Sequence, residues 1–420
     1  MMGLKRNQWL KPADLQKIQQ KRLRAILKYS YDNVEFYHRR FEAAGIRPED
    51  IKTFEDLPKI PVTKRSDIRD GVRARTILTK NTDLSKCTLS HTTGTSGEPL
   101  TIVFDEKAED FQKAVAVRSF LESGGSFRDK WAMITIPYRM RMKKKWFQGL
   151  GFLSPIYLSV FDSVEHNASV LKSLKPDVIE GYTTYIWLLA KAIREKRAEY
   201  FRPRIVITTA ELLTKDARDF INETFGLELF DQFGGAEIGR SAWECQEHVG
   251  YHMDVDALAM EFVKGNEHVA PGERGRLLYT SLYNYAMPLI RYDVGDVCVP
   301  MAELCPCGRG LPLLKIIEGR MDDLLTSSTG ELVSPTLLLI LMKETPGIAA
   351  FRILQETKTK LRVQIVKDEN FSNKTPLEIR KGIQRILGED VEVEINEVEE
   401  MPKDKSGKLR AITSKVPVDL

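Results

Sequence analysis

Residues 203–237 read PRIVITTAELLTKDARDFINETFGLELFDQFGGAE. The short apolar run at 205–208 predicts a buried strand, and so does the run at 227–233. Between them, residues 214–225 place apolar side chains at helical spacing. A strand, a helix and a second strand in succession favour parallel strands joined by a covering helix.

The same alternation extends toward the N-terminus. Apolar runs at 131–136 and 178–181 alternate with helical patterns at 164–174 and 183–199. These elements predict an α/β domain whose sheet is mainly parallel. The first 45 residues carry apolar positions at the spacing of an amphipathic helix, which we expect to pack against this domain.

The pattern changes in the C-terminal half. Segments 252–263, 275–282 and 289–299 read as strands bounded by Gly and Pro, which indicates a β-rich subdomain. The tail then reads strand, strand, helix, strand, which is typical of a small α+β domain. Its elements are expected at 351–354, 361–366, 375–387 and 391–398. The predicted division is therefore a large domain of residues 1–319 and a small domain of residues 320–420.

Composition and charge narrow the class of protein. The 420 residues are 42% hydrophobic, which is enough for one large core and a second, smaller one. With 63 basic and 59 acidic residues, nothing indicates a nucleic acid or an anionic membrane as partner. There is no apolar N-terminal signal, no stretch of about 18 apolar residues, and the five scattered cysteines do not resemble a disulfide framework. We expect a soluble, cytoplasmic protein.

A loop rich in hydroxyls and glycines occupies residues 91–100, HTTGTSGEPL. Its small residues let the backbone approach a phosphate, and its hydroxyls can donate to the phosphate oxygens. No Gly-Lys-Ser/Thr sequence closes the loop and a strand pattern follows it, so it is not a Walker loop. Taken alone, it fits a polar hairpin better.

Two carboxylates end glycine-containing turns. Glu237 closes FGGAE at 233–237, after a predicted strand, at the edge where open α/β sheets bind ligands. A carboxylate there could hold Mg²⁺ against phosphate oxygens. Asp296 closes RYDVGD at 291–296 and is suited to accept hydrogen bonds from both hydroxyls of a ribose. Each sequence is also that of an ordinary turn.

Two basic motifs lie near the C-terminus. GRMDD at 319–323 places Arg320 beside the predicted domain boundary, and MPKDKSGKLR at 401–410 places Lys408 in a glycine-containing loop. A lysine there could neutralise charge on an α-phosphate and on an attacking carboxylate together. Alone, the first motif is a surface turn and the second a solvated basic tail.

The five motifs occur in a fixed order that resembles the adenylate-forming superfamily of acyl-CoA ligases, nonribosomal adenylation domains and luciferases. Over nearly its whole length the chain is most similar to the phenylacetate-CoA ligase-like branch. Segments NVEFY at 33–37, FEDLPKIPVTK at 54–64 and PDVIEGY at 176–182 carry that similarity. The resemblance implies a large adenylate-forming domain, a mobile C-terminal lid at 320–420, and rotation of the lid between adenylation and thioester formation.

The resemblance also implies roles for individual residues. The phosphate loop would consist of Thr92, Thr93, Gly94, Thr95, Ser96 and Gly97. The adenine would be lined by Ala210, Glu211, Phe233 and Gly234. Glu237 would bind Mg²⁺, Asp296 the ribose and Arg320 the ribose or a phosphate, with Lys408 as the catalytic lysine. The acyl pocket would include Tyr138, Gly181 and Tyr182, with Trp146, Tyr185 and Trp187 as further candidates, and these aromatic residues favour an aryl acid.

Three departures from the family pattern bear on the chemistry. Glu98 stands where the loop usually carries lysine, which removes one cation from the triphosphate. Ala236 stands where the metal motif usually has a hydroxyl. The segment 327–335, SSTGELVSP, replaces a glycine-asparagine segment near the thioester-forming site, which leaves coenzyme A less well supported than ATP.

Cysteines and histidines gather in two clusters. Cys245 lies near His248 and His252, and Cys305 lies beside Cys307. Thiolate and imidazole are the usual ligands of structural Zn²⁺ in a closed four-coordinate site. The preferred set is Cys245, His252, Cys305 and Cys307, with His248 as the substitute histidine, and the alternative is buried thiols and surface histidines without metal.

The leading hypothesis is an AMP-forming acid–thiol ligase that uses ATP, Mg²⁺ and coenzyme A on an organic, by default aryl, acid. The partners expected are small molecules, and the resemblance admits a homodimer. One alternative is an adenylyltransferase that leaves AMP on its product, as in deazaflavin-coenzyme or polysaccharide-pathway relatives. Another is a nucleotide-binding protein without catalysis, against which Glu237, Asp296 and Lys408 argue.

Overall fold

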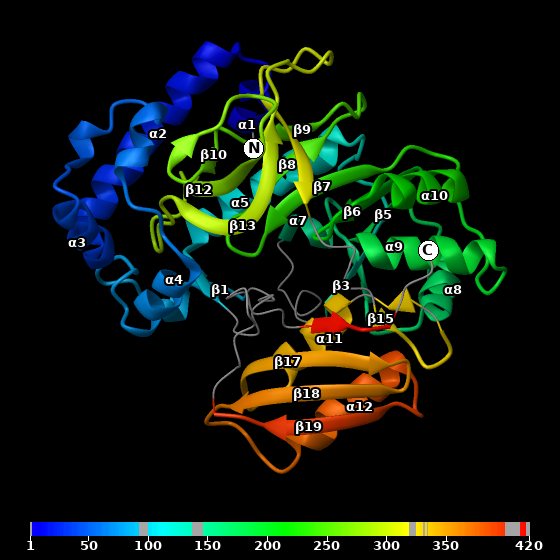
Figure 1. Ribbon diagram of the computed structural model, residues 1–420. Helices are drawn as coiled ribbons and strands as arrows, with labels where there is room; N and C mark the ends of the chain where they lie inside the picture. The colour runs from blue at the N-terminus through cyan, green and yellow to red at the C-terminus, as the bar shows by residue number, and fades with distance from the viewer. Residues whose placement is uncertain are drawn as a thin grey trace.

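The computed structural model describes residues 2–91, 100–136, 146–318, 325–330, 332–333, 335–399 and 412–416. Among these residues the largest element is a twelve-stranded sheet in the order β11-β10-β12-β13-β14-β9-β8-β7-β6-β5-β3-β4 (Figure 1). Its strands are β3 Trp131–Thr135, β4 Ile156–Ser159, β5 Val178–Tyr182, β6 Ile205–Thr209, β7 Phe230–Gly235, β8 Gly239–Glu244, β9 Tyr251–Met253, β10 Leu258–Lys264, β11 Glu267–His268, β12 Gly275–Ser281, β13 Tyr292–Pro300 and β14 Leu313–Glu318.

The strands β4, β3, β5, β6 and β7 form a parallel layer, as the alternating pattern predicts. One face is covered by α8 (Val164–Leu174), α9 (Thr183–Arg194) and α10 (Lys215–Phe225). Ile179 and Val206 point into the apolar core on that side. On the other face Phe120 of α5 (Glu106–Glu122) packs against Val178 and Ile205. Successive residues of a strand therefore serve opposite cores, which explains why these strands are apolar throughout.

From β7 onward, the described strand pairs of this sheet are antiparallel. The predicted β-rich subdomain thus continues the parallel layer in one sheet. The predicted strand 252–263 is two strands, β9 and β10, because the chain between them turns to place Asp254 and Asp256 against the fully buried Arg118. The Arg118 guanidinium lies 2.8 Å from Asp256, and such a buried charge requires a partner of this kind.

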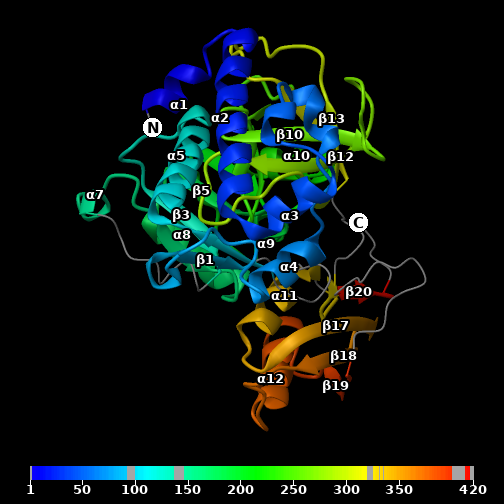
Figure 2. The same ribbon diagram turned by 90° about the vertical axis from the view of Figure 1, so that its left-hand side faces the viewer.

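The N-terminal helices cover the antiparallel half. They are α1 (Met2–Asn7), α2 (Pro12–Asn33), α3 (Glu35–Ala43) and α4 (Arg65–Arg73). Leu23, Ile26 and Leu27 bury the predicted apolar stripe of α2 in the same core as Leu258 of β10. Figure 2 shows α2 lying across β10 and β12.

Residues 325–416 contribute a separate apolar core. Its four-stranded sheet, in the order β19-β18-β17-β20, consists of β17 (Ile348–Thr357), β18 (Lys360–Lys367), β19 (Glu392–Glu397) and β20 (Ile412–Ser414). Two helices accompany it, α11 (Pro335–Glu344) and α12 (Thr375–Leu387). In Figure 1 this part, in yellow to red, forms a lobe of its own below the large sheet. The mixed α/β class and the small C-terminal unit agree with the prediction, whereas the proposed boundary at residue 319 lies outside the described residues.

The remaining elements are short. They are α7 (Trp146–Gly149), the hairpin strands β1 (Thr88–His91) and β2 (Thr101–Phe104), the pair β15 (Leu325–Thr326) and β16 (Leu332–Val333), and the 3₁₀ helices Pro48–Asp50, Phe54–Lys59 and Leu84–Lys86. In the part of the chain that the structure describes, no helix has both the length and the apolar character needed to cross a bilayer.

Candidate active site at the carboxyl edge of the parallel strands

The hairpin between β7 and β8 presents Glu237 at the carboxyl edge of the parallel layer. Gly235 pairs with Gly239, so residues 236–238 form a short turn that ends at Gly239 with φ +69°. Gly234 allows the strands to approach, because a Cβ there would lie 2.2 Å from the Gly239 carbonyl oxygen. Gly234 and Gly239 are thus required by the backbone that positions the carboxylate.

The Glu237 carboxylate is held by two side chains from other parts of the chain. The Tyr292 hydroxyl donates to Glu237 Oε1 at 3.2 Å, and Arg65 Nη1 lies 3.5 Å from the same oxygen. Arg65 is positioned by Thr63, whose N–H donates to the Arg291 carbonyl and whose carbonyl accepts from the Asp293 N–H. The Glu237 side chain is 13% exposed, so it is oriented yet open to a small ligand.

Asp296 lies on β13, in the same electrostatic environment. Burial and the neighbouring charges of Glu237 and Asp293 raise the pKa of Asp296 to about 6. Gly295, at φ +86°, directly precedes it within β13 and donates its N–H to Asp293 Oδ1 at 3.0 Å. An acidic side chain whose ionisation is disfavoured by a neighbouring carboxylate is suited to a site that receives a cation or several hydroxyl donors.

The predicted adenine-lining residues come from adjacent strand ends. Ala210 and Glu211 follow β6, while Phe233 and Gly234 end the neighbouring β7. Ala210 is exposed and has φ +69°, a strained conformation for a residue with a Cβ. The turn is fixed by Glu211, whose carboxylate accepts from the Thr184 N–H at 2.7 Å. The structure therefore places these four residues side by side at the edge that carries Glu237.

The two strands that flank the predicted phosphate loop form the hairpin of β1 and β2. Ser90, just before the loop, donates its hydroxyl to the Ala236 carbonyl at 3.0 Å. The entrance to the loop therefore lies beside the Glu237 turn. The loop residues Thr92, Thr93, Gly94, Thr95, Ser96, Gly97 and Glu98, together with Tyr138, Arg320 and Lys408, lie outside the described residues.

The predicted pocket residues are divided between the core and the surface. Gly181 faces the core, since a Cβ there would lie 3.1 Å from Ile186. Tyr185 is buried, and Asn167 donates to its hydroxyl at 2.6 Å. Trp187 packs against Phe220, while Trp146 is 80% exposed. Tyr182 is half-buried at the start of α9.

Three polar residues that the sequence did not single out meet at the same edge. Arg240 on β8 donates hydrogen bonds from its two terminal nitrogens, one to the Glu180 carboxylate on β5 and one to the Thr209 hydroxyl on β6. The Glu180 side chain is 4% exposed and that of Arg240 is 15% exposed. We refer to these three residues as the Arg240 cluster. The one available signal was a glutamate inside the apolar run 178–182, which requires a buried partner.

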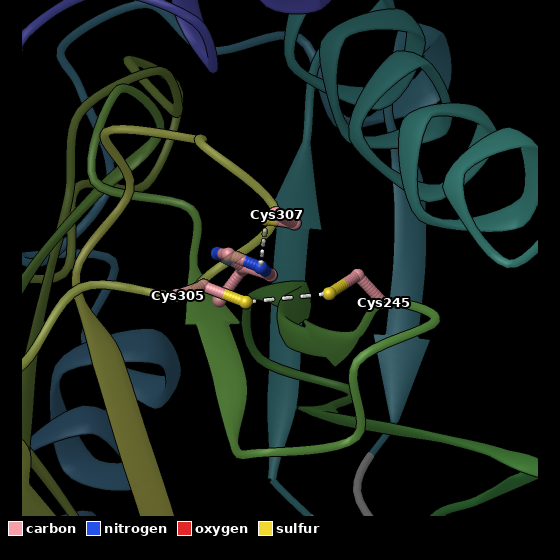
Figure 3. A group of neighbouring side chains, drawn as sticks. Cys245, Cys305 and Cys307 are labelled. Carbon is pink, nitrogen blue, oxygen red and sulfur yellow. Dashed lines mark hydrogen bonds between the residues drawn. The ribbon is translucent and has the colours of Figure 1, made fainter.

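The four preferred metal ligands converge in the antiparallel half. Cys245 Sγ lies 3.6 Å from Cys305 Sγ, and Cys307 Sγ lies 3.4 Å from His252 Nε2 (Figure 3). All four ligand atoms are within 4.8 Å of one another. Bonds of about 2.0–2.3 Å in a tetrahedron would place ligand atoms roughly 3.3–3.8 Å apart, so the donor set and spacing fit Zn²⁺. The substitute histidine, His248, instead stacks on Phe230 and faces Glu244.

Comparison with known proteins shows which enzymes this chain is similar to. Residues 325–415 match the model of the CapK C-terminal domain. The phenylacetate-coenzyme A ligase of Escherichia coli (strain K12) is 29% identical over 328 residues, which cover 74% of this chain and 72% of that protein. These similarities support the adenylate-forming superfamily, and within it the phenylacetate-CoA ligase-like branch, as the motifs predict.

Two further comparisons cover nearly the whole chain. The phenylacetate-coenzyme A ligase of Aromatoleum evansii is 25% identical over 430 residues and covers 96% of this chain and 95% of its own. The solved structure of a 2-hydroxyisobutyryl-CoA ligase, 21% identical, covers 99% of this chain and 91% of its own with a TM-score of 0.66, which confirms the fold.

Proposed function

We propose that this chain catalyses the ATP-dependent adenylation of a carboxylic acid and then transfers the acyl group to the thiol of coenzyme A. One observation supports this most strongly: Glu237 lies at the carboxyl edge of the parallel layer, beside the strand ends that carry Ala210 and Phe233, and its charge acts on Asp296 of β13. That is where an open α/β sheet binds a nucleotide. Relatives named phenylacetate-coenzyme A ligases supply the reaction class.

In the first step a carboxylate oxygen attacks the α-phosphorus of ATP and pyrophosphate leaves. Glu237, whose carboxylate is oriented by the Tyr292 hydroxyl, would hold Mg²⁺, and the ion would neutralise charge on the triphosphate. Asp296, when ionised, would accept from the ribose hydroxyls and fix the nucleotide. Arg65, next to Glu237, would add a cation near the phosphates, which partly replaces the lysine absent at Glu98.

Lys408 would complete the first step from the C-terminal lobe, by neutralising charge shared between the carboxylate and the α-phosphate. In the second step the coenzyme A thiolate would attack the acyl carbonyl carbon, and AMP would leave with the electron pair of the broken acyl–oxygen bond. Orientation and charge stabilisation would supply the rate, since the proposal uses no covalent protein intermediate.

A second candidate is an adenylyltransferase that leaves AMP on its product. The match of residues 325–415 to the CapK C-terminal domain and the divergent segment 327–335 favour it. It shares the nucleotide site, so the two candidates differ only in the fate of AMP.

We also propose that Cys245, His252, Cys305 and Cys307 hold a structural Zn²⁺. The ion would tie the end of β8 to β9 and to the loop after β13. Four protein ligands leave no open coordination position, which assigns the ion to stability rather than to chemistry.

The experiment is ATP–pyrophosphate exchange with a panel of acids, followed by mass analysis of products with and without coenzyme A. The proposal predicts acid-dependent exchange that Glu237→Gln and Lys408→Ala each reduce by about 100-fold or more. It also predicts an acyl thioester and free AMP. A product that retains AMP whether or not coenzyme A is present would support the adenylyltransferase, and no acid-dependent exchange would contradict both.

A further inference from the structure

The Arg240 cluster lies at the same edge of the sheet as the proposed nucleotide site. Arg240 is three residues beyond Glu237 on the same hairpin, and Thr209 directly precedes Ala210. Glu180 is in register with Met133 on β3 and with Ile207 on β6. In a parallel sheet, partners in register point to the same face. Charged and aliphatic side chains therefore share the face of the sheet on which Arg240 lies.

A structural role alone does not account for the cluster. An ion pair between a 4% exposed glutamate and a 15% exposed arginine stabilises a fold little more than apolar residues of similar volume would. The same chain has a matching pair at the opposite edge of the sheet, where Arg218 Nη2 lies 2.6 Å from Glu244 Oε1. Of these two pairs, the Arg240 cluster is the one at the edge where substrates bind in this fold class.

The chemistry of the cluster identifies the group it would recognise. Arginine has five N–H donors. Among the described residues, the hydrogen bonds to Thr209 and Glu180 each use one donor, on different terminal nitrogens of Arg240. Glu180 offers acceptor oxygens, so the cluster can both donate and accept. Because the charges of Arg240 and Glu180 cancel, the cluster would bind a neutral polar group. A second carboxylate on the substrate would require an additional cation in the site, and an ammonium group would require an additional anion.

Resting on the proposed function, we infer that the acid this protein activates carries a hydroxyl group on an aliphatic body, bound by Arg240 and Glu180. The hydroxyl donates to the Glu180 carboxylate and accepts from the Arg240 guanidinium. The aliphatic part lies beside Met133, which is in register with Glu180 on the neighbouring strand. An acid without the hydroxyl displaces water from Arg240 and Glu180 but offers them no hydrogen bond in return. It therefore binds more weakly than the hydroxy acid.

The test measures binding rather than turnover, so that it stands apart from the reaction itself. Acyl sulfamoyladenosines mimic the acyl adenylate and do not transfer their acyl group. Calorimetry would compare the butanoyl analogue with its 2-, 3- and 4-hydroxybutanoyl counterparts and with the phenylacetyl analogue. We expect at least one hydroxybutanoyl analogue to bind about 10-fold or more tightly than both the butanoyl and the phenylacetyl analogue.

Variants assign the preference to the cluster. In Arg240→Leu the advantage of the hydroxyl should fall to about twofold or less, while the butanoyl analogue still binds. If a buried Glu180 without its arginine prevents folding, the double variant Glu180→Leu, Arg240→Leu removes both charges and should show the same loss of the preference for the hydroxylated analogue. The control, Arg218→Leu, strands Glu244 at the opposite edge and should leave the preference unchanged.

Equal or weaker binding of every hydroxylated analogue by the wild type would overturn the inference, as would a preference that survives in the Arg240 variants. Tighter binding of the phenylacetyl analogue would overturn it in favour of an aryl acid. Failure of the proposed function gives a different result, since analogues would then bind without any acid-dependent pyrophosphate exchange.

Discussion

The ionised side chain of Asp296 is predicted to lower the free energy of unfolding of the unliganded protein, and the substitution Asp296→Asn should restore that stability. Its pKa rises from an ordinary value of 3.8 to about 6 in the folded state, mainly through burial and then through the charge of Glu237. The folded protein therefore holds the proton more tightly than the unfolded chain does. Stability is lost as the pH rises from about 4 to about 6 and stays lost above that range.

The size of the effect follows from the shift. Two pKa units correspond to about 3 kcal/mol, and partial exposure of the half-buried side chain reduces the expected gain in Asp296→Asn to about 1–2 kcal/mol at pH 8. About half of that gain should remain at pH 5, where the unfolded chain still ionises and the folded protein does not.

The assay is urea unfolding of wild type and Asp296→Asn at pH 8 and pH 5 without nucleotide, with AMP binding measured on the same samples. The variant should be more stable yet bind AMP about 10-fold more weakly at pH 8, because a carboxylate that accepts from ribose hydroxyls has been removed. Wild-type affinity for AMP should itself fall as the pH drops through about 6. A variant that is less stable at pH 8, or equally stabilised at both pH values, would refute the electrostatic reasoning.

Three further predictions concern single residues. Arg65→Ala should raise the KM for ATP about 10-fold without changing the KM for the acid, measured by pyrophosphate exchange, because only the cation beside Glu237 is lost. Cys305→Ser should abolish stoichiometric zinc in metal analysis and lower the melting temperature by about 10 °C, whereas His248→Ala should retain the metal. Gly234→Ala should cost about 3 kcal/mol or more in urea unfolding, since its Cβ would meet a backbone oxygen at 2.2 Å; a loss below about 1 kcal/mol would show that the hairpin can relax.

The spacing of apolar residues along the sequence predicted those helices and strands whose buried side chains recur at a regular interval. The helix predicted at 375–387 is α12 (Thr375–Leu387), because Ile379, Ile383 and Leu387 form one buried stripe. By contrast α5 lies outside the predicted elements. Its buried face includes Arg118 and Ser119, whose burial depends on polar partners more than a hundred residues away. Helix α11 is apolar at most positions, so its sequence shows no distinct face.

The candidate site divides in the same way. Glu237, Asp296 and the cysteine set could be named from the sequence because their chemistry is tied to short motifs. The Arg240 cluster could not be, since Glu180 and Arg240 meet only through the strand order β5, β6, β7, β8. Gly181 shows the same limit, because the alternation of side chains along β5 directs that position to the core.

The central claim is that a carboxylate oxygen of the substrate attacks the α-phosphorus of ATP. The most direct measurement supplies the acid with both carboxylate oxygens as ¹⁸O, together with ATP, Mg²⁺ and coenzyme A, and follows the label by mass spectrometry. The account predicts AMP that carries one ¹⁸O atom and a thioester that carries the other, with unlabelled pyrophosphate. Unlabelled AMP, or ¹⁸O recovered in inorganic phosphate, would contradict it.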